Sequence, residues 1–241
     1  MNSHTDTRGR AFAQGARDTV PLIFAAIPFG VVFGALALAN GLSREATLAM
    51  SMLVFAGSSQ FIAVTLLASA AAMPVILLTV FIVNLRQMLY SASLMPHVKA
   101  WPQRLRLLSS YFLTDETYAV VANHVMSKPG DQRLPWYYMG SALSMYGNWV
   151  LCTYVGMTLG QQIPDLTAWG LDIAMVVAFI GIVVPLLHSL PRVCCALVAG
   201  IGSVVCYEWP NQMGLLFSSL LAIAVGLLLE RVSSAREVAN V

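Results

Sequence analysis

An arginine lies in the middle of an apolar stretch of this chain. Residues 81–96 read FIVNLRQMLYSASLMP, and Arg86 follows Pro74 by twelve residues and precedes Pro96 by ten. Along an α-helix these separations are about 18 and 15 Å, which would put Arg86 near the centre of a hydrocarbon layer about 30 Å thick. An arginine at that depth is costly and usually faces a protein interior with a partner. Arg86 is therefore a candidate for binding an anionic group.

Other polar residues share helix faces with Arg86. At 100° per residue they form two neighbouring stripes, one of Arg86, Tyr90, Ser93 and His97 and one of Asn84, Gln87 and Ser91. Half of this helix is polar, and that half cannot face lipid. The acidic residues that could pair with the arginine are Asp115, Glu116 and Asp172. Such a pair either locks helices together or binds a charged ligand.

A neighbouring apolar segment, 43–72, is interrupted by polar residues. Ser43 can cap its start, and the interruption consists of Gly57, Ser58, Ser59 and Gln60. The two halves would be about 17 and 20 Å long, each a half-span. The segment is therefore predicted to be a span unwound at its centre or a re-entrant hairpin, either of which must line a protein-enclosed cavity. A packing kink is the simpler alternative.

A second interrupted segment, 104–126, contains FLTDETY at 112–118. Thr114 is placed to cap a helix whose first turn holds Asp115 and Glu116. The sequence thus combines a broken helix, a cationic helix and a broken acidic segment. This convergence favours a functional role for Arg86 over a purely structural one.

The composition indicates an integral membrane protein. Of 241 residues, 58% are hydrophobic and 10% charged, with a mean hydropathy of +0.74, whereas soluble chains are about 45–50% apolar and 25% charged. Apolar runs long enough to cross a bilayer occur near 20–39, 73–95, 136–159, 169–187, 192–207 and 212–229. They do not alternate as barrel strands do. We predict an all-α, polytopic helical membrane protein with six to eight membrane segments, two of them broken or re-entrant.

The distribution of Lys and Arg predicts the topology. With Arg86 set aside, a topology of eight plain spans places eight Lys and Arg residues on the cytoplasmic side and four outside. A topology of six spans with two non-crossing segments places eleven on the cytoplasmic side and one, Arg44, outside. We expect the second arrangement, with both termini cytoplasmic and residues 1–18 and 231–241 as tails. The 43–72 break then enters from outside, the 104–126 break enters from inside, and they meet near the midplane. The run at 20–39 is too long for a signal peptide and is expected to remain as the first helix.

Two sequence pairs suggest an internal repeat. Gly-x-x-x-Gly occurs at 30–34 and again at 156–160, and Phe-x-Gly occurs at 55–57 and again at 179–181. The offsets are 126 and 124 residues. Many transporters are built from such repeats, and glycine pairs let two helices approach closely.

Several classes of function are disfavoured. Basic residues are scattered at segment ends, so the net charge of +2 does not indicate a nucleic-acid partner. The four cysteines lie in apolar segments without a C-x-x-C spacing, and the four histidines lie far apart, which argues against a metal site. No cofactor is expected.

Five pieces of sequence, taken in order over about residues 15–185, resemble the AzlC family of branched-chain amino acid exporters. They are PFGVVFG, LVFAGSSQF, NLRQMLY, FLTDETYA and LGQQIP…WGLDIA. This chain has Gln87 where the family usually has histidine. The resemblance implies a single permease domain over residues 1–241 in a bacterial inner membrane, exporting valine, leucine, isoleucine and sometimes methionine. It also implies a small AzlD-type membrane subunit as partner.

The chemistry of a zwitterionic substrate assigns roles to the polar residues. The carboxylate needs a cation or a helix N-terminus, the ammonium needs an anion, and the side chain needs an apolar wall, here Phe55, Phe61 and Met88. The expected substrate-binding residues are Gly57, Ser58, Ser59, Gln60, Asn84, Arg86 and Tyr90. The expected ion-pair or proton-coupling residues are Asp115, Glu116 and Asp172, because acidic residues in membrane segments commonly relay protons.

Two other classes of function remain alternatives. An intramembrane enzyme would need a nucleophile–base pair or metal ligands, and neither Gly-x-Ser-x-Gly nor His-Glu-x-x-His occurs. A non-transporting scaffold subunit should tolerate neutralisation of Arg86. A permease should not.

Overall fold

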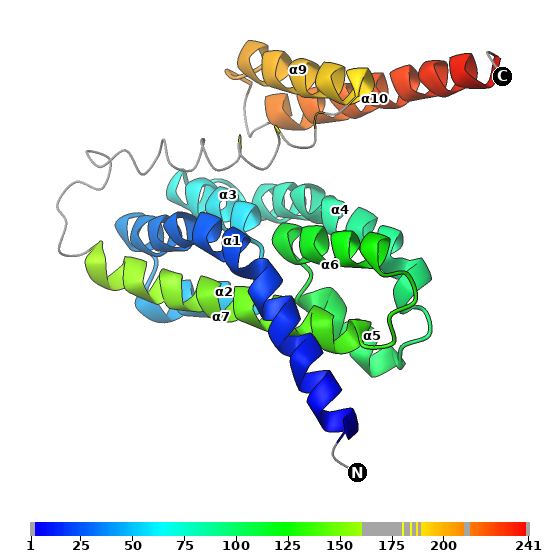
Figure 1. The fold of residues 1–241 in the computed structure, drawn as a ribbon. Coiled ribbons are helices and arrows are strands. Elements are labelled where there is room, and N and C mark those ends of the chain that lie inside the picture. The colour runs from blue at the N-terminus through cyan, green and yellow to red at the C-terminus, as the bar shows by residue number, and fades with distance from the viewer. Residues whose placement is uncertain are drawn as a thin grey trace. The chain divides into compact units, whose positions relative to one another are not determined.

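The structure is a computed structural model that describes residues 3–160, 180, 184, 187, 189–209 and 213–239. These residues form helices and no strand, which confirms the predicted all-α class (Figure 1). The chain divides into two compact units, Met1–Met175 and Val176–Val241. Among the described helices, Thr7–Ala39 and Met73–Val98 are long and apolar enough to cross a membrane.

The helices of unit 1 are α1 (Ser3–Ala39), α2 (Arg44–Leu53), α3 (Gly57–Ala68), α4 (Met73–Val98), α5 (Gln103–Tyr111), α6 (Asp115–Ser127) and α7 (Leu134–Leu159). The helices of unit 2 are α9 (Leu190–Val205) and α10 (Met213–Ala239). In unit 2, Gly202 meets Ser218 and Gly226 meets Cys195, so α9 and α10 form an antiparallel pair packed through small residues.

Helices α1 and α7 form the spine of unit 1 and run parallel, side by side (Figure 1). A Cβ on Gly15 would collide with the carbonyl of Tyr137, and one on Gly34 would collide with the carbonyl of Thr153. Contacts thus advance in the same direction along both helices. Both predicted Gly-x-x-x-Gly sequences lie on this contact, where backbones approach closely because glycine has no side chain. The 179–181 pair lies outside the described residues, so the internal repeat stays a prediction.

Helix α4 runs antiparallel to α7. Leu94, near its end, packs in one buried cluster with Leu134 at the start of α7. Just beyond α4, the ring of Trp101 lies 5.9 Å from that of Tyr138. The end of α4 therefore lies beside the start of α7.

The α2–α3 segment reverses the chain. Helix α2 begins after the end of α1 and packs on the second half of α7, where Ser51 hydrogen-bonds Thr153 at 2.8 Å. Its end reaches the middle of α7, where the carbonyl of Met52 accepts from Tyr146. Helix α3 then runs back toward the end of α1, because Phe61 packs on Phe33 at 5.7 Å and Val64 shares a cluster with Ala37. Segment 43–72 is thus a helical hairpin, which is the shape of the predicted re-entrant form. The interruption was expected at residues 57–60, but these form the first turn of α3 and the break lies at residues 54–56.

The α5–α6 segment also reverses the chain, from the other end of unit 1. Phe112, between α5 and α6, lies 5.1 Å from Tyr146 in the middle of α7. His124, near the end of α6, stacks on Tyr137 near the start of α7 at 3.8 Å. The two hairpins thus enter unit 1 from opposite ends, as predicted, and their turning points meet: the rings of Phe55 and Phe112 are 6.4 Å apart.

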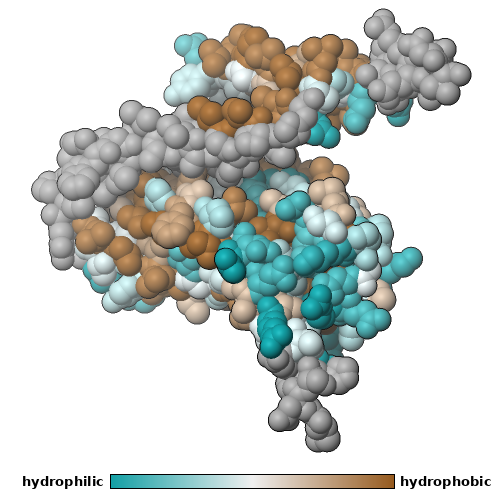
Figure 2. Space-filling model, in the orientation of Figure 1, coloured by the Kyte–Doolittle hydropathy of each residue, from teal (hydrophilic) through white to brown (hydrophobic). Residues whose placement is uncertain are grey.

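Basic residues collect at one end of unit 1, which we call the basic end. It comprises the start of α1, the α4–α5 connection and the α6–α7 loop, and it carries Arg8, Arg10, Arg17, Lys99, Arg104, Arg106, Lys128 and Arg133. The opposite end, at the α1–α2 and α3–α4 connections, carries Arg44. On the face drawn in Figure 2, hydrophilic surface gathers toward the start of α1. The 99–106 cluster therefore lies at the same end of unit 1 as the start of the chain, as the predicted topology requires.

Candidate functional site

Arg86 lies where α3, α4 and α6 meet. Its Nη1 lies 2.5 Å from Oδ2 of Asp115 in the first turn of α6, and its Nη2 donates to the hydroxyl of Ser58 at 2.8 Å. The two charged side chains are 31% and 23% exposed. The guanidinium thus reaches both hairpins from the middle of α4, using a different nitrogen for each.

The break before α3 is held in an unfavourable backbone conformation. Phe55 has φ +43°, a left-handed conformation that is rare for a bulky residue and persists only where packing imposes it. Its buried ring lies 4.9 Å from that of Tyr146 and also contacts Phe112. The carbonyl of Met52 accepts hydrogen bonds from the hydroxyls of Tyr146 and Tyr111. Aromatic residues of α5 and α7 therefore fix the turn that aims α3 at Arg86.

Within the described part of the chain, the start of α3 carries no side-chain cap, in contrast to the starts of α2 and α6. Ser43 accepts from the amide of Ala46 at 3.1 Å, and Thr114 accepts from the amide of Thr117 at 3.3 Å. The first amides of a helix point outward and carry the positive end of its dipole. Ser58, in the first turn of α3, bonds the Arg86 guanidinium, so a helix start and a cation meet in one region that favours a bound anion.

The structure distinguishes among the predicted acidic partners. Asp115 contacts Arg86, whereas Glu116 is half-buried in the same turn of α6. Asp172 lies outside the described residues. Among the residues that the structure describes, Nε of Arg86 and Oδ1 of Asp115 are buried without a hydrogen-bond partner. A buried donor and acceptor left open at one site can both be satisfied by a ligand that carries both kinds of group.

The other polar residues in the first turn of α3 bond partners other than Arg86. Ser59 is buried and donates to Oδ1 of Asn84 at 2.6 Å. Gln60 is also buried, accepts from the indole of Trp149 at 3.0 Å and donates to Ser51 at 3.2 Å. Both ends of the Gln60 amide are thus bonded by protein, which anchors α3 to α2 and α7.

Tyr90, the other predicted residue on α4, stacks on Tyr118 of α6. Their ring centroids are 4.4 Å apart and their planes differ by 15°. The hydroxyl of Tyr118 lies 3.0 Å from that of Ser93. Sequence reasoning missed Tyr118, although its position three residues after Asp115 puts both on one face of α6.

The three residues expected to form the apolar wall lie in different places. Phe55 is buried at the hairpin junction, and Phe61 is buried against Phe33. Met88 is 64% exposed and lies 200° around α4 from Arg86, so it is on another face of the helix. The aromatic residues that adjoin the break, Phe112 and Tyr146, were not anticipated.

The described residues contain no group of three His, Cys, Asp or Glu side chains that could hold a metal ion. The site is therefore described by an ion pair, a serine hydroxyl and a helix start, all from residues 57–115. This is also the part of the chain that known proteins share.

The model of the AzlC protein family matches residues 21–163. The chain belongs to the AzlC protein family. The match contains Arg86, Asp115 and both hairpins. No solved structure matches.

Three relatives of this AzlC-family chain give the range of similarity. An uncharacterized membrane protein of Archaeoglobus fulgidus is 31% identical over 160 residues, covering 66% of this chain and 68% of the relative. The inner membrane protein YgaZ of Escherichia coli is 28% identical over 151 residues, covering 62% and 61%. The branched-chain amino acid transport protein AzlC of Bacillus subtilis is 25% identical over 185 residues, covering 76% and 71%.

Proposed function

We propose that this AzlC-family chain is a multi-pass transporter of the bacterial inner membrane that exports branched-chain amino acids and, in some settings, methionine. The observation that carries the proposal is the contact of Arg86 with Asp115 and Ser58 where two hairpins meet. Transport sites at the centre of a membrane are commonly built from discontinuous helices of this kind. The printed name of the Bacillus subtilis relative supports the substrate class. Export as the direction follows from the family resemblance.

In this proposal the substrate carboxylate binds Arg86 and the first amides of α3. A guanidinium and a helix start both favour a carboxylate, and Ser58 is within reach of the same ligand. The substrate ammonium binds Asp115 or Glu116, which lie in the first turn of α6. Phe55, Phe112 and Tyr146 provide the neighbouring apolar surface.

Exchange of partners couples binding to conformation. When the site is empty, Asp115 neutralises Arg86, because an unpaired charge in this environment is costly. When the substrate carboxylate takes that place, Asp115 is released and can accept either the substrate ammonium or a proton. A proton bound by Asp115 removes its charge and weakens its hold on Arg86, which links proton uptake to substrate binding.

The charge distribution supports an orientation. Of the basic residues described at the two ends of unit 1, eight lie at the basic end and one lies at the opposite end, and cytoplasmic loops carry the excess of Lys and Arg. We therefore assign the basic end, and the N-terminus with it, to the cytoplasm. The count of Lys and Arg over the whole sequence places the C-terminus on the same side in this proposal. The small AzlD-type subunit remains part of the proposal as the partner of this chain.

Transport is favoured over the alternatives by the way the polar groups are used. The hydroxyls of Ser58 and Ser59 bond Arg86 and Asn84, so neither is activated by a general base in this structure. A scaffold subunit has no need of an arginine whose Nε is buried without a partner among the described residues.

The test is an efflux assay. Cells that lack other exporters of these amino acids are loaded with dipeptides of valine, leucine, isoleucine or methionine, with and without the small subunit. We expect free branched-chain amino acids to appear outside only when both genes are present. The Arg86→Gln variant, matched for amount in the membrane, should abolish the efflux. Unchanged efflux with Arg86→Gln would identify the chain as a scaffold.

A further inference from the structure

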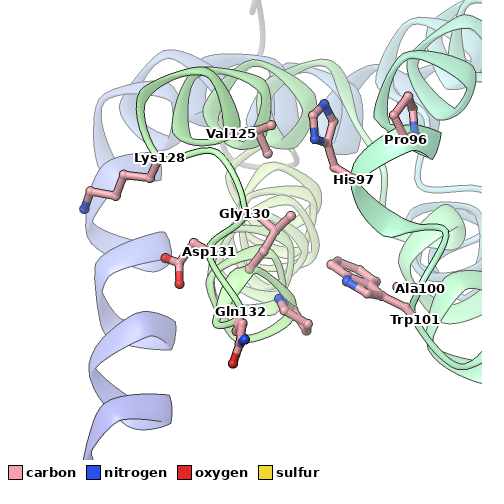
Figure 3. Close-up of a pocket in the computed structure, with 11 residues that line it drawn as sticks. Pro96, His97, Ala100, Trp101, Val125, Lys128, Gly130, Asp131 and Gln132 are labelled. Carbon is pink, nitrogen blue, oxygen red and sulfur yellow. The ribbon is translucent and has the colours of Figure 1, made fainter.

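A pocket opens at the basic end of unit 1, between the end of α4 and the α6–α7 loop (Figure 3). Its volume is about 390 Å³, in the range of small-molecule sites. Trp101 points across it toward the loop at Gly130, whereas Lys128 extends away from it. Its walls combine apolar residues, such as Val125, with polar ones, such as His97. We call it the basic-end pocket.

The basic-end pocket and the ion pair lie on one seam between α4 and α6. His97 is the last member of the polar stripe that begins at Arg86, eleven residues or about 16 Å away. Moving inward from His97, the same stripe presents Ser93, then Tyr90, then Arg86 with Asp115. The α4 face that lines the pocket therefore continues to the ion pair without changing side.

The stacked tyrosines stand between the two ends of this seam. Tyr90 comes from α4 and Tyr118 from α6, with nearly parallel rings 4.4 Å apart. The hydroxyls of Ser93 and Tyr118, 3.0 Å apart, add a hydrogen bond on the side of the pocket. Because the rings belong to different helices, a small separation of α4 from α6 breaks the stack and the hydrogen bond together.

We propose that the basic-end pocket is the vestibule through which a small zwitterionic substrate reaches Arg86 from the basic end, and that the Tyr90–Tyr118 stack is the gate that closes this path. The assignment of a substrate rests on the proposed function. The path and its gate rest on the geometry of α4 and α6. Tyr118 bonds Ser93 and stacks on Tyr90, so its effect is on access to the site. Tyr90 also lies beside Asp115, which places the stack directly at the entrance to the ion pair.

The test measures access and does not measure transport. Cys152, Cys194, Cys195 and Cys206 are changed to serine, and Ser58→Cys or His97→Cys is added as a reporter. Sealed membrane vesicles are treated with a membrane-impermeant cationic thiosulfonate, and the rate of thiol modification is measured. The vesicle orientation in which the His97→Cys reporter reacts defines the basic-end side. From that side we expect the Ser58→Cys reporter to react slowly when both tyrosines are present.

Removal of the stack should open the path. We expect Tyr118→Ala to raise the modification rate of the Ser58→Cys reporter by about tenfold, since both an aromatic stack and a hydrogen bond are lost. Tyr118→Phe retains the ring and should change the rate much less. Tyr90→Ala is the second opening variant in case Tyr118→Ala does not fold. Tyr154→Ala, on an exposed part of α7, is the matched control and should leave the rate unchanged.

The gate proposal is wrong if the Ser58→Cys reporter is modified at the same rate in the protein with both tyrosines and in both alanine variants. The vestibule proposal is wrong if the Ser58→Cys reporter reacts only from the side of the membrane opposite to the one from which the His97→Cys reporter reacts. If the alanine variants increase access as expected but the efflux assay detects no exported amino acid, the path is supported and the proposed substrate is wrong. The two proposals can therefore fail separately.

Discussion

Phe55 and Phe112 lie with ring centroids 6.4 Å apart and an interplanar angle of 69°, and each sits at the turning point of a different hairpin. Tyr146 packs edge-on against both rings, at 4.9 and 5.1 Å. The two turns thus pack directly on each other. Unpaired backbone groups at the centre of a bilayer are costly, and the carbonyl of Met52 beside the first turn is bonded by Tyr111 of the second hairpin and by Tyr146 of α7. The two hairpins are therefore expected to form as one unit with α7.

Close packing of α1 on α7 gives the first prediction. Gly156→Ala would place a Cβ against the carbonyl of Val31, whereas Gly147→Ala on the same helix meets none of the described residues within 4 Å. We expect Gly156→Ala to lower the free energy of unfolding by about 1–3 kcal/mol through overpacking. Gly147→Ala should be neutral or stabilising by up to about 1 kcal/mol, since alanine favours helix. Thermal unfolding in detergent compares the two, and equal effects would contradict the parallel α1–α7 contact.

The hairpin topology gives the second prediction. Arg104→Cys reports the α4–α5 connection and Ala72→Cys the α3–α4 connection, both at exposed positions. If both hairpins are re-entrant, an impermeant maleimide modifies the thiol at position 104 from the side of the N-terminus and the thiol at position 72 from the other side. Eight plain spans would instead place the α4–α5 connection opposite to the N-terminus. Labelling in intact cells and in inverted vesicles distinguishes these outcomes.

Part of this arrangement follows from local sequence. The predicted Thr114 cap gives the start of α6 at Asp115 correctly. The first interruption was predicted at residues 57–60, whereas these residues form the first turn of α3 and the chain breaks just before them. The length of a helix, its cap and the angle between residues on its surface are properties of that helix alone. The membrane topology stays a prediction from the distribution of Lys and Arg, which depends on which segments cross.

Contacts between helices could not be predicted in the same way. Periodicity gives the angle of Met88 relative to Arg86 but does not say which face of α4 meets α6. The sequence identifies Asp115 and Glu116 as candidate partners of Arg86, but it does not show which of these two neighbours makes the contact. The positive φ of Phe55 arises from the rings of Phe112 and Tyr146, which are distant in sequence.

The α6–α7 loop gives the third prediction. Burial alone would raise the pKa of Asp131, but hydrogen bonds from the side chain and backbone of Arg133 and from His124 outweigh it and lower the pKa to about 2. A carboxylate with a lowered folded pKa stabilises the fold above its ordinary pKa of 3.8, and the contribution is lost as the pH falls toward 2. We therefore expect Asp131→Asn to destabilise the protein at pH 7 by about 1–2 kcal/mol, a value reduced for screening at the exposed Arg133.

The same pair of proteins supplies the control for that prediction. As the pH is lowered from about 4 to 2, the parent should approach the stability of Asp131→Asn, because protonation removes the charge that the substitution removes. Thermal unfolding in an acid-tolerant detergent follows both proteins. A difference that persists unchanged at pH 2 would mean that Asp131 acts through packing and not through its charge.

Proton coupling through the start of α6 gives the fourth prediction. Asp115→Asn removes the anion that contacts Arg86, and Glu116→Gln removes the adjacent one. If either carboxylate carries the coupled proton, its amide variant should lose uphill transport in energised vesicles but keep downhill exchange, which needs no net proton movement. An uncoupler that dissipates the proton gradient should reduce uphill transport by the parent protein to the rate measured for that variant. Unchanged uphill transport in both variants, or insensitivity of the parent to the uncoupler, would end the proton hypothesis.

The fifth prediction concerns the two nitrogens of Arg86. Nη1 reaches Asp115 and Nη2 reaches Ser58, so the planar guanidinium joins α6 to α3 in a way that one ammonium group cannot. Arg86→Lys keeps the charge, so it should insert and assemble normally, yet export should fall by about tenfold or more, as loss of one charge-assisted hydrogen bond implies. Arg86→Gln lacks the cation altogether and should lose export entirely. Efflux is measured at matched amounts of protein in the membrane.

Parental export by Arg86→Lys would show that a point charge suffices and that the fork geometry has no role in transport. The decisive comparison is between Arg86→Gln and the double variant Arg86→Gln with Asp115→Asn. Removing one member of a buried pair leaves an uncompensated charge, and removing both restores neutrality. If Arg86 holds substrate, the double variant regains the parental amount in the membrane but not export. If the double variant regains both, the ion pair is a structural strut between α4 and α6, and the substrate carboxylate must bind elsewhere, with the uncapped start of α3 as the remaining site.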